Sequence, residues 1–353
     1  MDLLGRFPWS TGDPPGFVAA YRHFVDTCRA TGATNLRYVW SPGGDASLQE
    51  YWPGAAYVDY TAGPLKVPSQ DLVIATYWTT LRIARSFGLG PQAHFCQGYE
   101  GGLIHLRPVL REIEEVYSWK LPTLTISPYL GDLLREQFGR ESRTVSPPLD
   151  PLFRPMWRFG PRRRPWIAIP GIFEAEVKGI PTALEAVRRL RESGIPCRVF
   201  RFSILPLSEG EKALLEPDRY LHGVHPQVIA EALRFCDLLI LPSQAEEGFG
   251  LPLLEAMASK VPAVASRIPS TVYITEGAVP LVPPGDAAAF AGAARELLTS
   301  RSAWRLARER GYEASRRFLP DAVAPKLVEA IRWARERGQE PLPVASLSME
   351  TRP

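Results

Sequence analysis

The sequence predicts an α/β protein of two domains, each built on a parallel β-sheet covered by helices. Short apolar segments alternate with helix-length amphipathic segments from about residue 71 to residue 335, a pattern typical of parallel sheets that are buried on both faces. Four prolines between residues 147 and 155 interrupt the alternation and predict a linker over residues 147–164. The clearest single unit, residues 238–258, consists of a strand, a glycine-containing loop and a helix.

The composition fits a globular protein. The chain has 353 residues, of which 45% are hydrophobic and 22% charged, and a chain of this length can form two ordinary domains. The net charge of +3 is too small to indicate a nucleic-acid partner. No apolar run approaches the roughly 20 residues that span a bilayer, and no signal peptide is recognisable. The four cysteines form no C-x-x-C pair, so we expect reduced thiols, no metal site and a cytoplasmic location.

The first half of the chain begins irregularly and then settles into alternation. In the first 60 residues we expect an irregular start over 1–13, a helix over 14–30 and strands over 36–40 and 56–60. Further on we expect strands at 71–76, 92–97, 123–127 and 143–146, separated by helices at 78–87, 104–118 and 128–138.

The second half repeats the alternation. Expected strands are 166–169, 198–204, 221–224, 238–242 and 261–266, and expected helices are 180–192, 227–235, one starting at Pro252, 287–298, 302–317 and 321–337. Asp286 is the predicted N-cap of the helix over 287–298. Proline and serine are frequent from residue 339 onward, so residues 336–353 are predicted to be a disordered tail.

The segment Ser243–Ala258 has the features of a ligand site. Its loop leads into a helix with Pro252 at the start, and the free N–H groups of a helix start attract anions. Glu247 in the loop and Glu255 on the helix are acceptors suited to sugar hydroxyls. From the pattern alone, an acidic first turn that only complements the helix dipole is an equal alternative.

Residues 1–60 contain a series of aromatic motifs. They are Phe7-Pro-Trp9, Tyr21-Arg-His-Phe-Val-Asp26, Gly32-Ala-Thr-Asn35, Val39-Trp-Ser-Pro42, Tyr51-Trp-Pro-Gly54 and Tyr57-Val-Asp-Tyr60. On these motifs the segment resembles a fragment of the family 26 β-mannanases. That family uses two catalytic glutamates, whereas Glu50 is the single glutamate of this segment. We therefore predict a non-catalytic segment, and the alternative is an unusual first portion of the next domain.

The remainder of the chain carries a longer series of motifs. They are Phe153-Arg-Pro155, Lys178-Gly179, His222-Gly-Val224, Asp237-Leu-Leu-Ile-Leu-Pro-Ser243, Glu247-Gly-Phe-Gly-Leu-Pro-Leu-Leu-Glu-Ala-Met-Ala258, Val261-Pro-Ala-Val-Ala265 and Val282-Pro-Pro-Gly-Asp286. On these motifs residues 61–335 resemble the family 4 (group 1) glycosyltransferases. The resemblance implies the GT-B fold, in which two Rossmann-like domains face a central cleft, and a retaining transfer from a nucleotide-sugar donor. It also favours a ligand site at Ser243–Ala258.

The resemblance assigns roles to individual positions. Glu247 and Lys178 are the implied catalytic residues: Glu247 holds a hydroxyl of the donor sugar, and Lys178 pairs with the donor diphosphate. Glu255 is implied to bind the ribose, and Gly223 and Val224 to lie near the base. The other implied donor-binding positions are Ser243, Gly248, Phe249, Gly250 and Leu251. No metal or other cofactor is implied.

The chain departs from the family pattern in two places. Family members usually carry an arginine soon after the glycine that corresponds to Gly171, where this chain has Ile172; Arg162–Arg164 or Arg267 are candidates to replace it. The glycine-rich first strand and loop of the N-terminal domain is also missing, so this domain is predicted to be incomplete or atypical.

Two residues of the N-terminal domain are candidates for contact with the acceptor or with the donor sugar. Gln97 and Glu100 follow a predicted strand, at the edge where open α/β sheets bind ligands. A polar loop without a ligand explains them nearly as well.

The sequence thus predicts four parts: a mannanase-like segment over 1–60, a partial acceptor domain over 61–150, a nucleotide-sugar-binding domain over 151–335, and the tail over 336–353. The predicted function is transfer of a sugar from a nucleotide-sugar to a glycan or lipid-linked acceptor in cell-surface polysaccharide synthesis. Arginines at 162–164 and within 301–317 are candidates for contact with phosphates or for peripheral contact with an anionic membrane. A solvated face is the favoured alternative for both stretches. The alternatives are a non-catalytic fusion product that binds a nucleotide-sugar and, less favoured, a mannan hydrolase.

Overall fold

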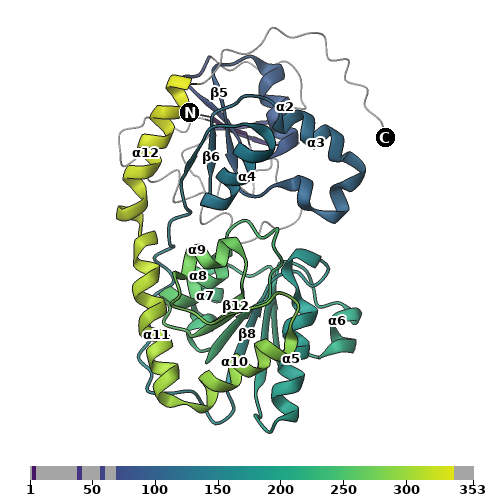
Figure 1. Ribbon diagram of the computed structural model, residues 1–353, viewed down its shortest axis with the longest axis vertical. Coiled ribbons are helices and arrows are strands. Elements are labelled where there is room, and N and C mark those ends of the chain that lie inside the picture. The colour runs from purple at the N-terminus through teal and green to yellow at the C-terminus, as the bar shows by residue number, and fades with distance from the viewer. Residues whose placement is uncertain (1, 5–37, 42–55, 60–68, 338–353) are drawn as a thin grey trace. The chain divides into compact units, whose positions relative to one another are not determined.

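The computed structural model describes residues 2–4, 38–41, 56–59 and 69–337 (Figure 1). These residues form two compact α/β units, each with its own parallel sheet. One unit contains the described strands up to residue 59 together with residues 69–145 and 324–337, and the other contains residues 146–323. The predicted helix over 14–30 lies outside the described residues.

The first unit is built on a seven-stranded parallel sheet of order β3-β2-β1-β4-β5-β6-β7. Its strands are β1 (Asp2–Leu4), β2 (Tyr38–Ser41), β3 (Ala56–Asp59), β4 (Val73–Ala75), β5 (Gln92–Cys96), β6 (Thr123–Thr125) and β7 (Ser142–Thr144). Its helices are α2 (Trp78–Phe87), α3 (Leu110–Tyr117), α4 (Pro128–Phe138) and most of α12 (Pro320–Arg337).

The first three strands join this sheet through β1. Leu3 of β1 lies opposite Ile74 of β4 on one side and opposite Val39 of β2 on the other. The sheet is therefore more complete than the sequence predicts, because the first 60 residues supply three of its strands. β1 itself lies in a stretch that was expected to be irregular.

The expected helix over 104–118 is interrupted. Pro108 has no backbone N–H to donate, and the chain forms 3₁₀ turns at Glu100–Gly102 and Ile104–Val109 before α3 begins at Leu110. The helix therefore starts six residues later than its amphipathic pattern predicts.

The second unit is built on a six-stranded parallel sheet of order β10-β9-β8-β11-β12-β13. Its strands are β8 (Trp166–Pro170), β9 (Arg198–Ser203), β10 (Arg219–His222), β11 (Leu238–Leu241), β12 (Ala263–Ser266) and β13 (Leu281–Val282). Its helices are α5 (Ile180–Glu192), α6 (Glu209–Leu214), α7 (Pro226–Arg234), α8 (Leu251–Ala258), α9 (Pro269–Thr275), α10 (Ala287–Thr299) and α11 (Arg301–Ser315).

The core of this unit follows from the apolar stripes of its sequence. Buried side chains of β8, β9, β11 and β12 pack against α5 and α10, and α8 packs on β11 and β12. Asp286 caps α10 as predicted, because its carboxylate accepts a hydrogen bond from the N–H of Ala289 at 2.9 Å. The expected strands and helices are present within a few residues, whereas α6, α9 and β13 were not expected.

The unit boundaries differ from the predicted domain limits at both ends. The first boundary falls between Val145 and Ser146, a few residues before the predicted one. Residues from Ala324 onward group with the first unit, although the sequence assigns the chain up to residue 335 to the C-terminal domain. α12 continues to Arg337, and residues 338–353 of the predicted tail lie outside the described residues.

Candidate functional site

The strand order of the second sheet places two loops next to each other. β8 lies between β9 and β11, so the chain continues from β8 on one side of the sheet and returns later on the other side. The loops over residues 171–179 and 242–250 follow β8 and β11. Because the strands are parallel, both loops leave the sheet at its C-terminal end, where the strands finish. Open α/β sheets bind ligands at such a reversal of strand order.

Lys178, Glu247 and Ser243 meet across these two loops. Nζ of Lys178 lies 2.7 Å from Oε2 of Glu247, and Oγ of Ser243 donates a hydrogen bond to the same oxygen at 3.0 Å. Ser243 is fully buried, while the side chains of Glu247 and Lys178 are 12% and 32% exposed. Both residues implied to be catalytic are therefore in direct contact, and the ammonium group belongs to the more exposed partner.

The backbone holds the two loops close together. Gly179 has φ of +59°, and a Cβ at this position would lie 2.1 Å from the carbonyl oxygen of Pro242. Next to it, the N–H of Gln244 donates to the carbonyl of Val177 at 2.8 Å. Only glycine allows both this conformation and this approach. Backbone packing as well as the ion pair thus fixes Lys178 beside the β11 loop.

A buried arginine binds the backbone at the end of β8 and at the start of the loop that follows it. Arg201 of β9 is fully buried and donates to the carbonyl oxygens of Ile169 at 2.5 Å and Gly171 at 2.8 Å. Its charge is balanced by Glu211 of α6, 2.5 Å away and equally buried. Sequence reasoning did not identify this pair, although Ser208 and Glu211 form the spacing of a helix N-terminus, and Ser208 does cap α6.

The glycine loop before α8 offers its backbone rather than its aromatic ring. Gly250 has φ of +98° and is the N-cap residue of α8. The ring of Phe249 is buried and packs edge-on against Phe318, with 5.6 Å between the ring centroids. This leaves the backbone from Gly248 to Leu251 as the part that can line a pocket, as the family resemblance implies. Pro252 occupies the second position of α8 instead of the first.

Glu255 lies on α8 and is almost completely buried. The residue is 8% exposed, and its burial raises the pKa of the carboxyl group to about 8, with the nearby Asp150 carboxylate contributing in the same direction. At neutral pH the group is therefore largely protonated in the ligand-free protein. A buried carboxyl group of this kind can exchange hydrogen bonds with hydroxyl groups of a ligand.

Gly223 and Val224 follow β10, the edge strand two positions from β8. Gly223 has φ of +58°, and its N–H donates to the carbonyl of Ser203 at 3.3 Å. The two residues lie at the same end of the sheet as Lys178, but further along it.

In the first unit, Glu100 is turned toward the protein interior. Its carboxylate is buried and accepts a hydrogen bond from the hydroxyl of Tyr117, which also donates to the carbonyl of Gly98 at 3.2 Å. Burial raises the pKa of Glu100 to about 7. Gln97 is half-buried just after β5. Both residues follow the strand as expected, and the structure gives Glu100 a protein partner.

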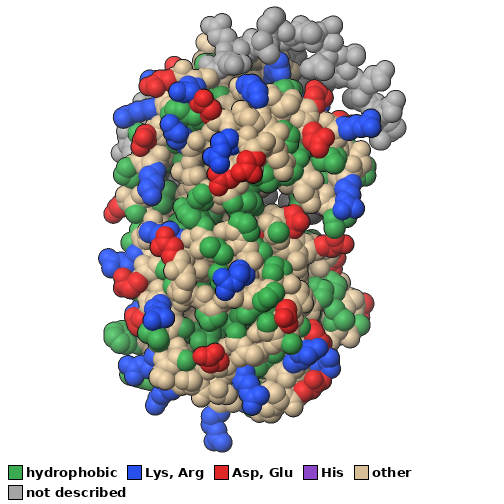
Figure 2. Space-filling view, viewed as in Figure 1, with side chains coloured by type: hydrophobic (Ala, Val, Ile, Leu, Met, Phe, Trp, Pro, Cys, Tyr) green, Lys and Arg blue, Asp and Glu red, His purple; other side chains and the backbone are tan. Residues whose placement is uncertain are grey.

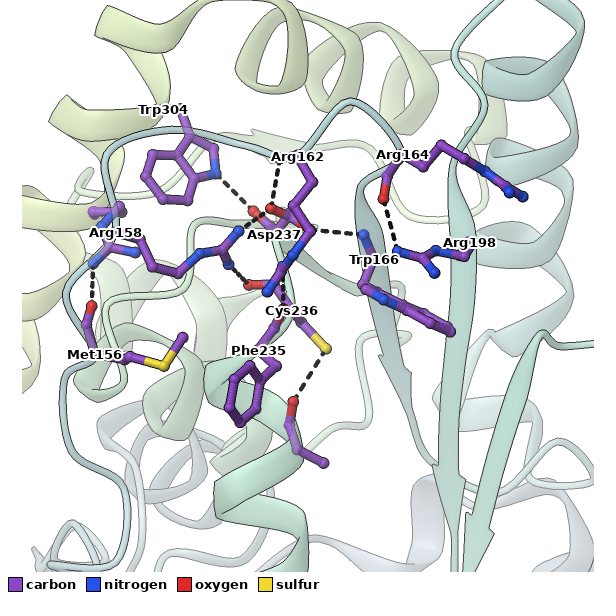
Figure 3. Close-up of polar contacts among 12 residues, drawn as sticks. Met156, Arg158, Arg162, Arg164, Trp166, Arg198, Phe235, Cys236, Asp237 and Trp304 are labelled. Carbon is purple, nitrogen blue, oxygen red and sulfur yellow. Dashed lines mark hydrogen bonds and ion pairs between the residues drawn. The ribbon is translucent and has the colours of Figure 1, made fainter.

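Arg162 and Arg164 lie at the N-terminal end of the second sheet, where its strands begin. Arg162 lies 2.9 Å from Oδ2 of the fully buried Asp237, which also accepts a hydrogen bond from the N–H of Trp166 at 2.8 Å (Figure 3). Arg158 binds the other oxygen of this carboxylate. The side chain of Arg164 points away from Asp237 (Figure 3). Because these residues precede β8 and β11, they cannot replace the arginine missing at Ile172.

Arg267 is better placed for that role. It follows β12, which pairs with β11, and so lies at the end of the sheet that carries Lys178. Its guanidinium donates to the carbonyl of Leu281 at 3.1 Å.

Two further observations concern the described residues alone. No group of three or more His, Cys, Asp or Glu side chains is arranged to hold a metal ion in this part of the chain. None of the described helices combines the length and apolar character needed to cross a bilayer.

Basic and acidic side chains are interspersed on the face shown in Figure 2.

Comparison with known proteins identifies the family. The putative colanic acid biosynthesis glycosyltransferase WcaL of Escherichia coli is 34% identical over 325 residues, which cover 82% of this chain and 76% of that protein. Residues 164–300 match the family described as Glycosyl transferases group 1. The chain belongs to the group 1 glycosyl transferases.

Other relatives of this group 1 glycosyl transferase match over shorter stretches. The phosphatidyl-myo-inositol mannosyltransferase of Mycobacterium leprae is 35% identical over 133 residues, and the match covers 36% of this chain and 34% of that protein. Endoglucanase H of Acetivibrio thermocellus is 37% identical over 67 residues, covering 16% of this chain and 7% of the endoglucanase. The chain thus spans well under half the length of these two proteins.

Solved structures support the GT-B fold. HepE of Anabaena, solved in complex with UDP-glucose, has a TM-score of 0.73 at 14% identity and covers 94% of this chain and all of its own. Sucrose-phosphate synthase of Thermosynechococcus elongatus has the same TM-score at 18% identity, covering 94% of this chain and 98% of that one. The group 1 glycosyl transferase described here therefore has the GT-B fold of two Rossmann-like domains that the sequence predicts.

Proposed function

We propose that this protein is a retaining glycosyltransferase that moves a sugar from a nucleoside diphosphate sugar to a glycan or lipid-linked acceptor. The observation that carries the proposal is the contact of Lys178, Glu247 and Ser243 across the strand reversal. This arrangement offers one cation for a diphosphate and one carboxylate for sugar hydroxyls, next to the backbone N–H groups at the start of α8.

The residues divide the donor between them. Lys178 binds the diphosphate and stabilises the negative charge that builds up on it as the bond to the sugar breaks. When the diphosphate draws Lys178 away, the Glu247 oxygen that contacted it accepts hydrogen bonds from sugar hydroxyls, while Ser243 continues to orient the carboxylate. Glu255 binds the ribose, and Gly223 and Val224 lie beside the base. Arg267 supplies a second cation for the diphosphate.

The bond changes need no basic side chain of the protein. The bond between the anomeric carbon and the diphosphate oxygen breaks, and a bond from the acceptor oxygen to the same face of that carbon forms. The acceptor proton passes to the departing diphosphate. Binding energy and orientation at the donor then account for the catalysis, and we propose that no metal ion or other cofactor takes part.

The acceptor side is proposed from the relatives. WcaL is named for colanic acid biosynthesis and the mycobacterial relative for phosphatidyl-myo-inositol, which supports a role in cell-surface polysaccharide or glycolipid synthesis. Gln97 is our candidate for an acceptor contact, and Glu100 for a residue that shapes the loop around it. We also propose a cytoplasmic protein that associates with the membrane surface.

Residues 1–60 are proposed to have no hydrolase activity. The segment contains a single glutamate, Glu50. Its strands β3, β2 and β1 join the sheet of a transferase through the pairing of β1 with β4. The short match to endoglucanase H is consistent with their ancestry in a glycoside hydrolase.

A donor screen tests the proposal. The full chain is incubated with UDP-, GDP-, dTDP- and ADP-sugars, with and without lipid-linked glycans, and the released nucleotide is measured. We expect release from one donor class, and a drop of about 100- to 1,000-fold in Lys178→Ala and in Glu247→Gln. Arg295→Ala, an exposed substitution on α10, serves as the control and should keep wild-type turnover. Release that is equal in all four proteins would show that the site is assigned wrongly.

A further inference from the structure

The loop over residues 156–164 exposes large aromatic side chains. Trp157 is 93% exposed and Phe159 is 71% exposed, although such side chains are usually at least half-buried in a folded protein. Phe235, at the end of α7, is also 54% exposed, and its carbonyl accepts a hydrogen bond from Arg162 at 2.5 Å. Three aromatic residues are thus presented to solvent from one region of the second unit.

The backbone of this loop is anchored on both sides of the exposed residues. Arg308 donates to the carbonyl of Met156 at 2.7 Å, and Arg301 donates to the carbonyl of Phe159 at 2.8 Å. Between these points, Arg158 binds Asp237 and donates to the carbonyl of Cys236 at 2.6 Å (Figure 3). The aromatic side chains are therefore held outward by a fixed backbone, which reduces the entropy that a binding surface loses on contact.

The loop that carries Trp157 and Phe159 has charge of a single sign along its sequence. Residues 151–173 contain arginines at 154, 158 and 162–164 and no aspartate or glutamate. Arg163, Arg164 and Arg301 are exposed, and Arg164 is directed away from the Asp237 cluster (Figure 3). We call Trp157, Phe159, Phe235, Arg163, Arg164 and Arg301 the aromatic–arginine surface.

We propose that the aromatic–arginine surface binds an anionic lipid bilayer. Tryptophan and phenylalanine insert at the level of the lipid headgroups, and arginines beside them bind lipid phosphates. A protein partner is less suitable, because protein interfaces combine both signs of charge and bury about 800 Å² per partner, whereas this surface consists of a few projecting side chains. The proposal rests on the membrane association proposed above and not on the transfer chemistry.

The position of the surface leaves the donor site open. The loop precedes β8, and Lys178 follows it, so the two lie at opposite ends of the same sheet. The five residues of β8 span roughly 16 Å at 3.3 Å per residue. A protein docked through the aromatic–arginine surface therefore keeps Lys178 away from the bilayer and accessible to a soluble nucleotide-sugar.

Vesicle sedimentation of the full chain tests the proposal. Vesicles of phosphatidylcholine alone are compared with vesicles of phosphatidylcholine and phosphatidylglycerol in equal parts. We expect binding to the anionic vesicles only, weakened by salt. Arg163→Ala with Arg164→Ala should lower it by about 25-fold, since each arginine near an anionic surface contributes about fivefold. Trp157→Ala with Phe159→Ala should lower it on the order of tenfold or more.

Matched substitutions separate this surface from general charge. Arg332→Ala with Arg335→Ala removes two exposed arginines of α12 and should leave vesicle binding within twofold of wild type. Nucleotide release without vesicles should be unchanged in all three double variants, so a failed donor screen and a failed membrane test remain distinguishable. Vesicle binding that survives the aromatic substitutions, or that falls equally in the α12 variant, would overturn the proposal. So would binding of the wild type to RNA with equal sensitivity to the aromatic substitutions.

Discussion

At each end of the strands of the second sheet a carboxylate contacts basic side chains, but the two carboxylates differ in burial. At one end Asp237 is fully buried between Arg158 and Arg162 and also accepts backbone N–H groups. At the other end Glu247 and Lys178 remain partly exposed. A buried pair cannot be opened without leaving an uncompensated charge, whereas a partly exposed pair exchanges partners at little cost. Burial thus distinguishes the structural cluster from the site that can accept a ligand.

The largest change in stability is expected on removing Asp237, the buried carboxylate at the N-terminal end of the sheet. Asp237→Ala leaves two arginines and the backbone N–H groups of Arg162 and Trp166 without their acceptor, and we expect a loss of about 3–5 kcal/mol in the free energy of unfolding. Denaturant titration measures it. Asp132→Ala, which breaks an exposed ion pair with Arg135, is the control and should cost under about 1 kcal/mol. Equal losses in the two variants would refute the contrast.

Lys178, at the C-terminal end of the sheet, should show the reverse: a small change in stability and a large loss of turnover. We expect Lys178→Ala to change the free energy of unfolding by less than about 1 kcal/mol, while turnover falls by the 100- to 1,000-fold given above. Denaturant titration and nucleotide release on the same preparation compare the two quantities. A variant that loses several kcal/mol of stability would place Lys178 with the structural cluster.

Gly179→Ala tests how closely the two loops must approach. A Cβ here meets the carbonyl of Pro242, so we expect a loss of about 2–3 kcal/mol together with a marked fall in nucleotide release. Gly194→Ala imposes a similar positive φ with no atom within 4 Å and should cost about 1–2 kcal/mol without loss of turnover. Similar turnover in the two variants would show that the approach of the loops is not required.

The smallest effect, taken over a single pH unit, comes from the titration of Glu255. The pKa of Glu255 rises from 4.5 to about 8 on folding, so between these values the folded protein holds a proton that the unfolded chain has released. Stability therefore falls as pH rises through this window, by at most about 1.4 kcal/mol per pH unit. Glu255→Gln should remove this slope in urea titrations at several pH values. Glu100 titrates with the same sign in both proteins and cancels in the difference.

Sequence reasoning was most successful where local pattern and family motif agree. Lys178 and Glu247 each stand in a short motif after an apolar strand, and parallel strands necessarily bring such loops to one end of the sheet. The structure adds their direct contact. The strands near residues 40 and 57 were also expected, but not their pairing with β4 through β1, because pairing between strands distant in sequence leaves no local signature.

The residues that were missed depend on partners elsewhere in the fold. Arg201 binds backbone carbonyls of a neighbouring strand, and no side-chain pattern encodes those acceptors. Glu100 appeared to be a polar loop residue because Tyr117, its partner, is 17 positions further along the chain. The sequence predicts a ligand or membrane contact for Arg162 because its partner, Asp237, is 75 positions away.

The central claim is that Lys178, at the C-terminal end of the second sheet, binds the donor diphosphate. Calorimetry tests it most directly. The affinity of the nucleoside diphosphate released in the donor screen is measured for the wild type, Lys178→Ala and Arg163→Ala. We expect a loss of about tenfold or more for Lys178→Ala, since an ionised hydrogen-bond partner contributes roughly 1.5–3 kcal/mol, and an unchanged affinity for Arg163→Ala at the opposite end. Equal affinity in all three proteins would contradict the claim.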